Sequence, residues 1–300
     1  MKTSCQLFAV LAAASLLLPL PARTAPSPDA PARDKPLVLT TIFPLLDFAR
    51  TIAGDDLRVE SILPVGAEPH SYSPAPSDLL RIRSAAAFLY ASEELESWTL
   101  PLLADAPSSL RVLAAAPLPP DSDDPHVWLD PLLSLDIATR IQTLFSALLP
   151  EAAPRFAARA DALRADLRAL HEDYASALAP FAGRTLLFAG HFAFGHLAAR
   201  YRLLPASPYP GFAPDATPSP RALASMVRLM RSTGASALFY EEIDPRVARV
   251  LAAETGARLL PLHSLHNLSS ADLADPSAPP TYFSLMRQNL SRLRQGLETP

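Results

Sequence analysis

Two hydrophobic periods alternate along most of the chain. Short apolar runs predict strands, and longer segments with an apolar residue at every third or fourth position predict helices. The predicted strands cover residues 37–41, 57–63, 86–90, 110–113, 185–188, 237–240 and 258–262. The predicted helices that alternate with them cover residues 45–53, 77–83, 194–201, 221–232, 244–255 and 281–297. Alternation of this kind favours βαβ units and largely parallel sheets.

The middle of the chain has a different pattern. Residues 131–178 show almost no strand signal and contain no glycine, and their apolar residues recur at helical spacing. Pro150 and Pro154 divide this region into two helices. The second, over residues 154–178, is long enough to bridge two lobes at about 1.5 Å per residue. We therefore predict an α/β fold with two similar α/β lobes, parallel-rich sheets and a single long rigid helix that joins the lobes.

The N-terminus has the pattern of a secretory signal. Lys2 is followed by an apolar run over residues 7–18, which ends at prolines and small residues. This run is shorter than the roughly 20 residues that a membrane span needs, although an uncleaved anchor is an alternative. The domains that we predict are a signal peptide (1–25), a flexible Pro-rich tether (26–36), an N-terminal lobe (37–150), an interlobe linker helix (151–180) and a C-terminal lobe (181–300).

Composition excludes some classes of function. The formal net charge is -4 and no basic block is present, which argues against a nucleic-acid partner. The one cysteine, Cys5, precedes the apolar run, so removal of a signal peptide would leave no thiol. A metal site in the mature chain would therefore depend on histidines and carboxylates.

Seven histidines are the residues with candidate chemistry. His70, His191 and His263 follow predicted strands, and His126 lies in a stiff loop before the central helices. In open α/β sheets, ligand groups gather outside the carboxyl ends of the strands. Imidazoles from both lobes would suit a borderline metal such as Zn²⁺ best, and Cu, Ni and Fe are alternatives. Imidazoles bind metal only when neutral, so affinity is expected to fall below about pH 6.5.

The other histidines have simpler interpretations. His171 and His196 lie within predicted helices, and we interpret both as structural. His266 is close to His263, but we assign it to a turn with Asn267.

Four motifs resemble the zinc- and manganese-binding receptors of ABC importers, the cluster A-I solute-binding proteins. They are GAEPHSYSPAPSD at residues 66–78, DPHVWLDP at 124–131, GHFAFGHLA at 190–198 and YFSLMRQNL at 282–290. The motifs occur in the order of the family, and the likeness extends over nearly all of the predicted mature chain.

The resemblance implies a periplasmic receptor that binds a divalent metal between its lobes and delivers it to the membrane permease of an ABC importer. It implies a monomer without enzymatic activity. His70, His126 and His191 would be ligands. The family commonly has an acid as the fourth ligand, but here that position falls on His263, so His263, Glu241 or a water completes the shell. Histidines without a clear carboxylate favour zinc over manganese, which prefers oxygen ligands.

Three alternative functions follow from the same residues. The first is a manganese receptor of the same family. The second is a zinc-dependent hydrolase, in which Glu241 or Glu242 would act as general base, although the chain has no His-Glu-x-x-His or Gly-x-Ser-x-Gly motif. The third is a metal-binding adhesin that uses the same fold.

Overall fold

The computed structural model describes residues 35–209, 217–241 and 245–298. The predicted signal peptide (1–25) and residues 26–34 of the predicted tether lie outside the described residues. Among the helices of the described part, none is both long and apolar enough to cross a membrane.

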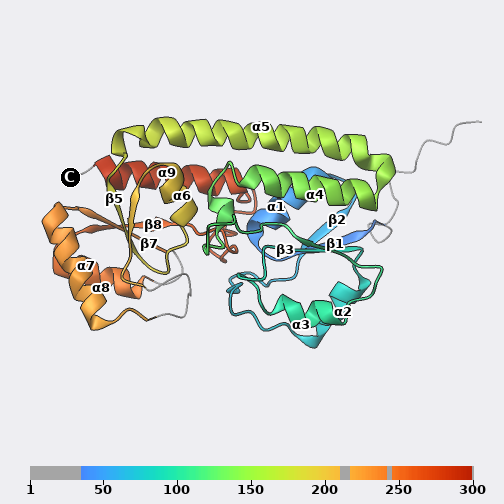
Figure 1. The fold of residues 1–300 in the computed structure, drawn as a ribbon, viewed down its shortest axis with the longest axis horizontal. Coiled ribbons are helices and arrows are strands. Elements are labelled where there is room, and N and C mark those ends of the chain that lie inside the picture. Colours follow the sequence, from blue (N-terminus) through green and yellow to red (C-terminus); the bar gives the residue numbers. More distant parts are fainter. Residues whose placement is uncertain (1–34, 210–216, 242–244, 299–300) are drawn as a thin grey trace, which may run out of the picture. The chain divides into compact units, whose positions relative to one another are not determined.

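Two parallel sheets form the frame of residues 35–298 (Figure 1). The first has the order β2-β1-β3-β4 and consists of β1 (Leu37–Thr40), β2 (Arg58–Ser61), β3 (Ala87–Tyr90) and β4 (Arg111–Ala114). The second has the order β6-β5-β7-β8 and consists of β5 (Thr185–Ala189), β6 (Leu204–Ala206), β7 (Ala237–Glu241) and β8 (Arg258–Leu262). The same strand order thus occurs twice, which confirms the predicted fold class of two similar α/β lobes.

Helices cover both faces of each sheet (Figure 1). Those of the first lobe are α1 (Phe43–Ala53), α2 (Pro76–Ser84), α3 (Thr99–Ala104) and α4 (Ser134–Leu148). Those of the second are α6 (Gly195–Arg200), α7 (Pro220–Thr233), α8 (Arg246–Thr255) and α9 (Tyr282–Glu298). The outer faces of the two sheets have separate apolar clusters, under α2 and α3 in the first lobe and under α7 and α8 in the second.

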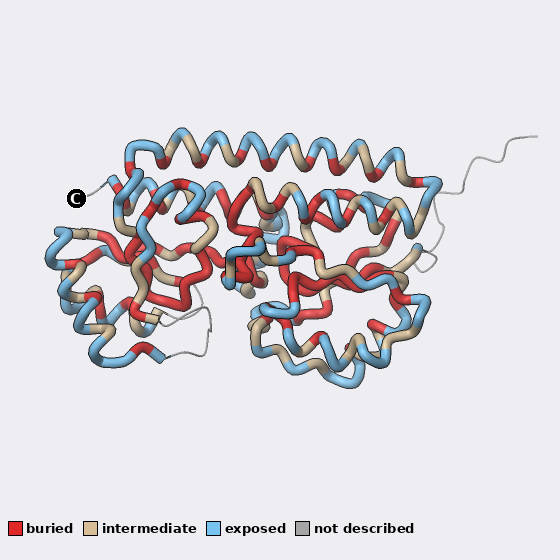
Figure 2. Tube along the Cα trace, viewed as in Figure 1, coloured by how far each residue is buried: buried red, intermediate tan, exposed pale blue. Residues whose placement is uncertain are grey.

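The long helix α5 (Ala153–Leu178) joins the lobes. Its 26 residues give a length of about 39 Å. Its buried side chains recur every three or four residues and form one stripe, made of Phe156, Ala160, Leu163, Leu167, Leu170, Tyr174 and Leu178. This stripe faces α1 and α4 in the first lobe and α9 in the second, while the opposite face of α5 is exposed (Figure 2). One apolar cluster therefore continues from the first lobe through α5 into the second.

All seven predicted strands are present, but one short strand and one short α-helix were not predicted. Strand β6 has three residues, includes Pro205 and lies at the edge of its sheet, where a missing N–H is tolerated. Helix α3 has six residues and contains Pro101. Neither element is long enough to show a hydrophobic period, so the sequence pattern does not reveal it.

The buried stripe of α5 can be tested by truncation. We expect Leu170→Ala to lower the free energy of unfolding by about 2–5 kcal/mol, because Leu170 is fully buried and its loss leaves a cavity. Urea denaturation would measure the change. Arg168→Ala on the exposed face of the same helix is the control, and equal losses for both variants would contradict the assignment.

Candidate metal centre

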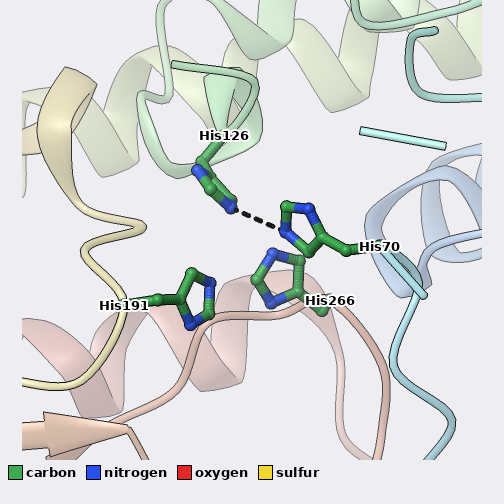
Figure 3. A group of neighbouring side chains, drawn as sticks. All are labelled: His70, His126, His191 and His266. Carbon is green, nitrogen blue, oxygen red and sulfur yellow. Dashed lines mark hydrogen bonds between the residues drawn. The ribbon is translucent and has the colours of Figure 1, made fainter. Parts of the chain in front are cut away.

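Four histidines converge from four loops. His70 follows β2, His126 follows β4 and precedes the short 3-10 turn η1 (Val127–Leu129), His191 follows β5, and His266 follows β8. One ring nitrogen of each residue can be chosen so that all four lie within 4.8 Å of one another. Figure 3 shows the four rings facing a common centre. The carboxyl ends of strands from both sheets supply the group, as expected for open α/β sheets.

The spacing of the closest pair fits a shared tetrahedral ion. The Nε2 atoms of His70 and His126 are 3.3 Å apart (Figure 3). Two nitrogens bonded at about 2.0–2.1 Å to one tetrahedral zinc ion are separated by roughly 3.3–3.4 Å. These two side chains therefore have ligand spacing without any rearrangement.

The cluster is withdrawn from solvent. His126 and His266 are fully buried, His191 is 3% exposed, and His70 is half-buried. Nε2 of His266 is buried and has no hydrogen-bond partner among the described residues. A buried polar atom without a partner is costly, and coordination to a cation would satisfy this nitrogen.

Asp124 fixes the orientation of His126. Its Oδ1 lies 2.6 Å from Nδ1 of His126 and also accepts the backbone N–H of that residue at 3.0 Å. A carboxylate at Nδ1 places the proton there and leaves the lone pair on Nε2, which faces the cluster. Burial raises the pKa of Asp124, while the backbone N–H of His126 and the nearby His196 act in the opposite direction.

Glu241 has the corresponding role in the second lobe, where it contacts the rings of His191 and His266. This residue ends β7, and its Oε2 lies 2.7 Å from Nδ1 of His191 while its Oε1 lies 3.7 Å from Nδ1 of His266. Burial alone would raise the pKa of Glu241, but the neighbouring imidazoles outweigh it and hold the pKa well below the usual range. Glu241 is therefore a charged partner of two rings in this structure and does not belong to the group of four converging side chains.

The imidazoles of the cluster resist protonation. Burial is the main cause that lowers the pKa of His70 and of His266 from 6.5 to about 3, and neighbouring rings act in the same direction. Burial also lowers the pKa of His126 well below its ordinary value. The rings thus stay neutral and able to bind metal at a lower pH than the ordinary histidine pKa of 6.5 suggests.

Comparison with known proteins gives the family. Residues 38–296 match ZnuA, the family described as the periplasmic component A of zinc-uptake complexes. The chain belongs to this family.

Relatives of this chain are described as zinc-binding proteins. The zinc-binding protein AdcA of Streptococcus pyogenes is 30% identical, over 88% of this chain and 56% of AdcA. The chain thus spans about half the length of the curated relatives that head the comparison. The Zn(II)-bound ZnuA-like domain of Streptococcus pneumoniae AdcA has a TM-score of 0.76 at 30% identity and covers 88% of this chain and 100% of that domain.

A third similar protein is described as having two activities. The laminin-binding protein Lmb of Streptococcus agalactiae has a TM-score of 0.79 at 30% identity, with 88% of this chain and 100% of that chain covered. It is described as a bifunctional protein with adhesin and metal-transporting activity. The same fold therefore occurs in a protein described as metal-transporting.

His263 does not join the other three predicted residues, which corrects our expectation for the fourth position. The side-chain amide of Asn289 brackets its backbone, accepting from the N–H of His263 and donating to its carbonyl oxygen, both at 2.8 Å. Its Nδ1 accepts the backbone N–H of Leu265, and its Nε2 lies 3.3 Å from Asp272. The ring of His263 is thereby turned away from the cluster.

His266 takes that place, although the sequence pattern assigned it to a turn. The chain reverses at Leu265, which has a φ of 59°, a value rare for a branched side chain. This reversal directs His266 toward His70 and His126, with ring centroids 5.2 and 4.9 Å away. The one available signal was a second histidine four residues beyond the strand end, three after His263. His171 and His196 lie outside the cluster, beside Tyr201 and the carbonyl of Asp124.

The role of Glu241 can be tested by neutralising it. We expect Glu241→Gln to weaken zinc binding roughly 10- to 100-fold, because the rings of His191 and His266 lose the carboxylate that orients them. Isothermal titration would measure the dissociation constant. Glu254→Gln removes an exposed carboxylate as the control, and unchanged affinity for Glu241→Gln would contradict this role.

The depressed pKa values predict how stability depends on pH. Between about pH 6.5 and 3 the unfolded chain binds protons at these histidines and the folded chain does not, so stability present above pH 6.5 is lost on acidification. We expect His266→Asn to reduce the slope of unfolding free energy against pH by about 1.4 kcal/mol per pH unit near pH 5. Urea titrations of the metal-free protein from pH 7 to 4 measure the slope, and equal slopes would refute this account.

Proposed function

We propose that this protein is a zinc receptor, which captures Zn²⁺ outside the cytoplasmic membrane and delivers it to an ABC importer. The observation that carries the proposal is the convergence of four imidazole nitrogens within 4.8 Å of one another, from both lobes. In this proposal His70, His126, His191 and His266 are the ligands. Zinc is the cargo of the protein, held and released without chemical change.

The donor set favours zinc over manganese. Four neutral nitrogen donors in a compact group match the tetrahedral preference of Zn²⁺, whereas Mn²⁺ prefers oxygen ligands and a higher coordination number. With His266 in the group, no carboxylate is among the four donors. A manganese receptor is therefore the weaker reading of this site.

The geometry supports binding without catalysis. A hydrolytic zinc ion typically has three protein ligands and keeps its fourth position for water. Here four side chains surround the centre, and the nearest carboxylates, Asp124 and Glu241, lie against Nδ1 atoms on the far sides of the rings. Neither carboxylate is thus placed to activate a water at the metal.

Location and partners follow from the same proposal. We propose that residues 1–25 direct export, that the mature protein is a periplasmic monomer, and that its partner is the permease of an ABC importer. The family description as a periplasmic zinc-uptake component supports this location. The predicted lobes (37–150 and 181–300) and linker helix (151–180) would be the units of the receptor.

Calorimetric titration of metal-stripped protein tests the proposal. We expect one Zn²⁺ per chain and much weaker binding of Mn²⁺, because the donors are nitrogens. His266→Asn should weaken zinc binding by more than the roughly 10- to 100-fold that loss of an outer partner costs.

His263→Asn is the matched control for this titration. An amide at position 263 can still accept the backbone N–H of Leu265, so the loop keeps its turn, and zinc affinity should stay close to that of the unaltered protein. If His263→Asn abolished binding and His266→Asn did not, the ligand assignment would be wrong. Absence of zinc binding by the unaltered protein would end the proposed function itself.

A further inference from the structure

Asn267 connects the loop of His266 to the loop of His70. Its side-chain N–H groups donate to the carbonyl oxygens of Pro64 and Ala67, at 2.6 and 3.0 Å. The backbone N–H of Gly66 donates to the carbonyl oxygen of Leu268 at 2.8 Å. Three hydrogen bonds thus join a first-lobe loop to a second-lobe loop, immediately beside two of the four histidines.

The amide of Asn267 is oriented by its own turn. Its Oδ1 accepts the backbone N–H of Leu268 at 2.8 Å, which leaves both N–H groups directed at the facing loop. Gly66 has a φ of +77°, which favours glycine, and a Cβ there would meet nothing within 4 Å. The facing loop therefore has an exposed, tightly turned backbone whose carbonyl groups are available to the amide.

The loop of His126 is attached to the second lobe in a different way. The indole N–H of Trp128 donates to the carbonyl oxygen of Ser264 at 2.9 Å, and the hydroxyl of Tyr282 donates to the carbonyl oxygen of Trp128 at 2.7 Å. All these groups are buried. Arg200 of α6 adds an ion pair with buried Asp130 at 2.8 Å. Separating this loop from the second lobe would disrupt packed, buried contacts.

The loop of His70 is the side on which opening costs less. Pro64, Val65 and Gly66 are exposed, and His70 is the least buried of the four histidines. Hydrogen bonds at exposed backbone groups can exchange with water, so their rupture costs less than the rupture of buried ones. The attachment of the His70 loop to the second lobe is therefore weaker than that of the His126 loop, because its hydrogen bonds are more exposed.

We propose that Asn267 is a positioning residue that holds residues 64–70 closed over the metal, so that its two hydrogen bonds to Pro64 and Ala67 set the rate at which zinc leaves. This inference rests on the proposed zinc-receptor function and adds the path of release. His70 moves away first, together with its loop, while His126, His191 and His266 stay in place. Asn267 contacts no metal in this scheme and acts through the loop of His70.

We call the two hydrogen bonds from Asn267 to Pro64 and Ala67 the clasp, and the rate of zinc release tests its role. Zinc-loaded protein is mixed with excess chelator in a stopped-flow instrument, and the dissociation rate is compared for unaltered protein, Asn267→Ala and Asn267→Asp. We expect release to be roughly tenfold faster in both variants, because each loses two hydrogen bonds of ordinary net strength. Ser277→Ala, which alters an exposed polar turn on the same β8–α9 connection, is the control and should release zinc at the original rate.

Asn267→Asp distinguishes the loss of the clasp from a loss of the turn at Leu268 and from a change in electrostatic attraction. The new carboxylate can still accept the N–H of Leu268, so the turn persists, but it cannot donate to Pro64 or Ala67. Its negative charge would attract the cation and slow release, so faster release cannot be an electrostatic effect. If Asn267→Ala does not fold, this variant alone decides the question.

Two results would overturn the inference. One is a release rate for Asn267→Asp equal to that of the control. The other is faster release accompanied by a matching fall in the thermal midpoint of the metal-free protein, since a general loss of structure would then explain it. Zinc binding that persists in the unaltered protein and depends on His266, with no effect of Asn267, would refute the clasp and leave the zinc-receptor function intact.

Discussion

The burial of four neutral imidazoles around one point is the constraint on which the rest of this structure depends. Rings packed this closely cannot be protonated together at moderate pH, because each positive charge would be desolvated and would repel the next. The metal-free protein therefore keeps neutral rings facing one another, with the Nε2 atoms of His70 and His126 at hydrogen-bond distance. A cation at that centre would accept the lone pairs of the neutral rings and satisfy the unpaired Nε2 of His266, and it needs strand ends from both sheets to meet there.

The carboxylates behind the rings would offset the charge of the zinc ion that we propose the site binds. Neutral imidazoles bring no charge of their own, and a buried dication without counter-charges would be very costly. Asp124 stands behind His126, and Glu241 stands behind His191 and near His266. Two carboxylates one layer out would balance the two positive charges of a bound zinc ion, so a ligand set without carboxylates is compatible with a buried site.

Sequence reasoning predicted the parts that depend on local pattern. The seven longer strands, the central helix and the loops of His70, His126 and His191 follow from hydrophobic periods and from strand ends. The choice between His263 and His266 does not, because it depends on Asn289, 26 residues further on, which brackets the backbone of His263. The left-handed backbone at Leu265 also determines which histidine faces the cluster, and no glycine in the sequence indicates this conformation. The position of Glu241 behind the rings likewise depends on the direction in which its side chain leaves the end of β7. The sequence of acidic residues alone does not show this direction.

The continuous core under α5 limits how the empty and loaded forms can differ. A hinge that swings one lobe against the other would have to separate packed side chains along a helix of about 39 Å. The continuous core therefore favours differences that are limited to the loops near the four histidines. Under the proposed function, a transporter that accepts only the metal-loaded protein would have to recognise the conformation of those loops. It would not detect a change in the distance between the two lobes.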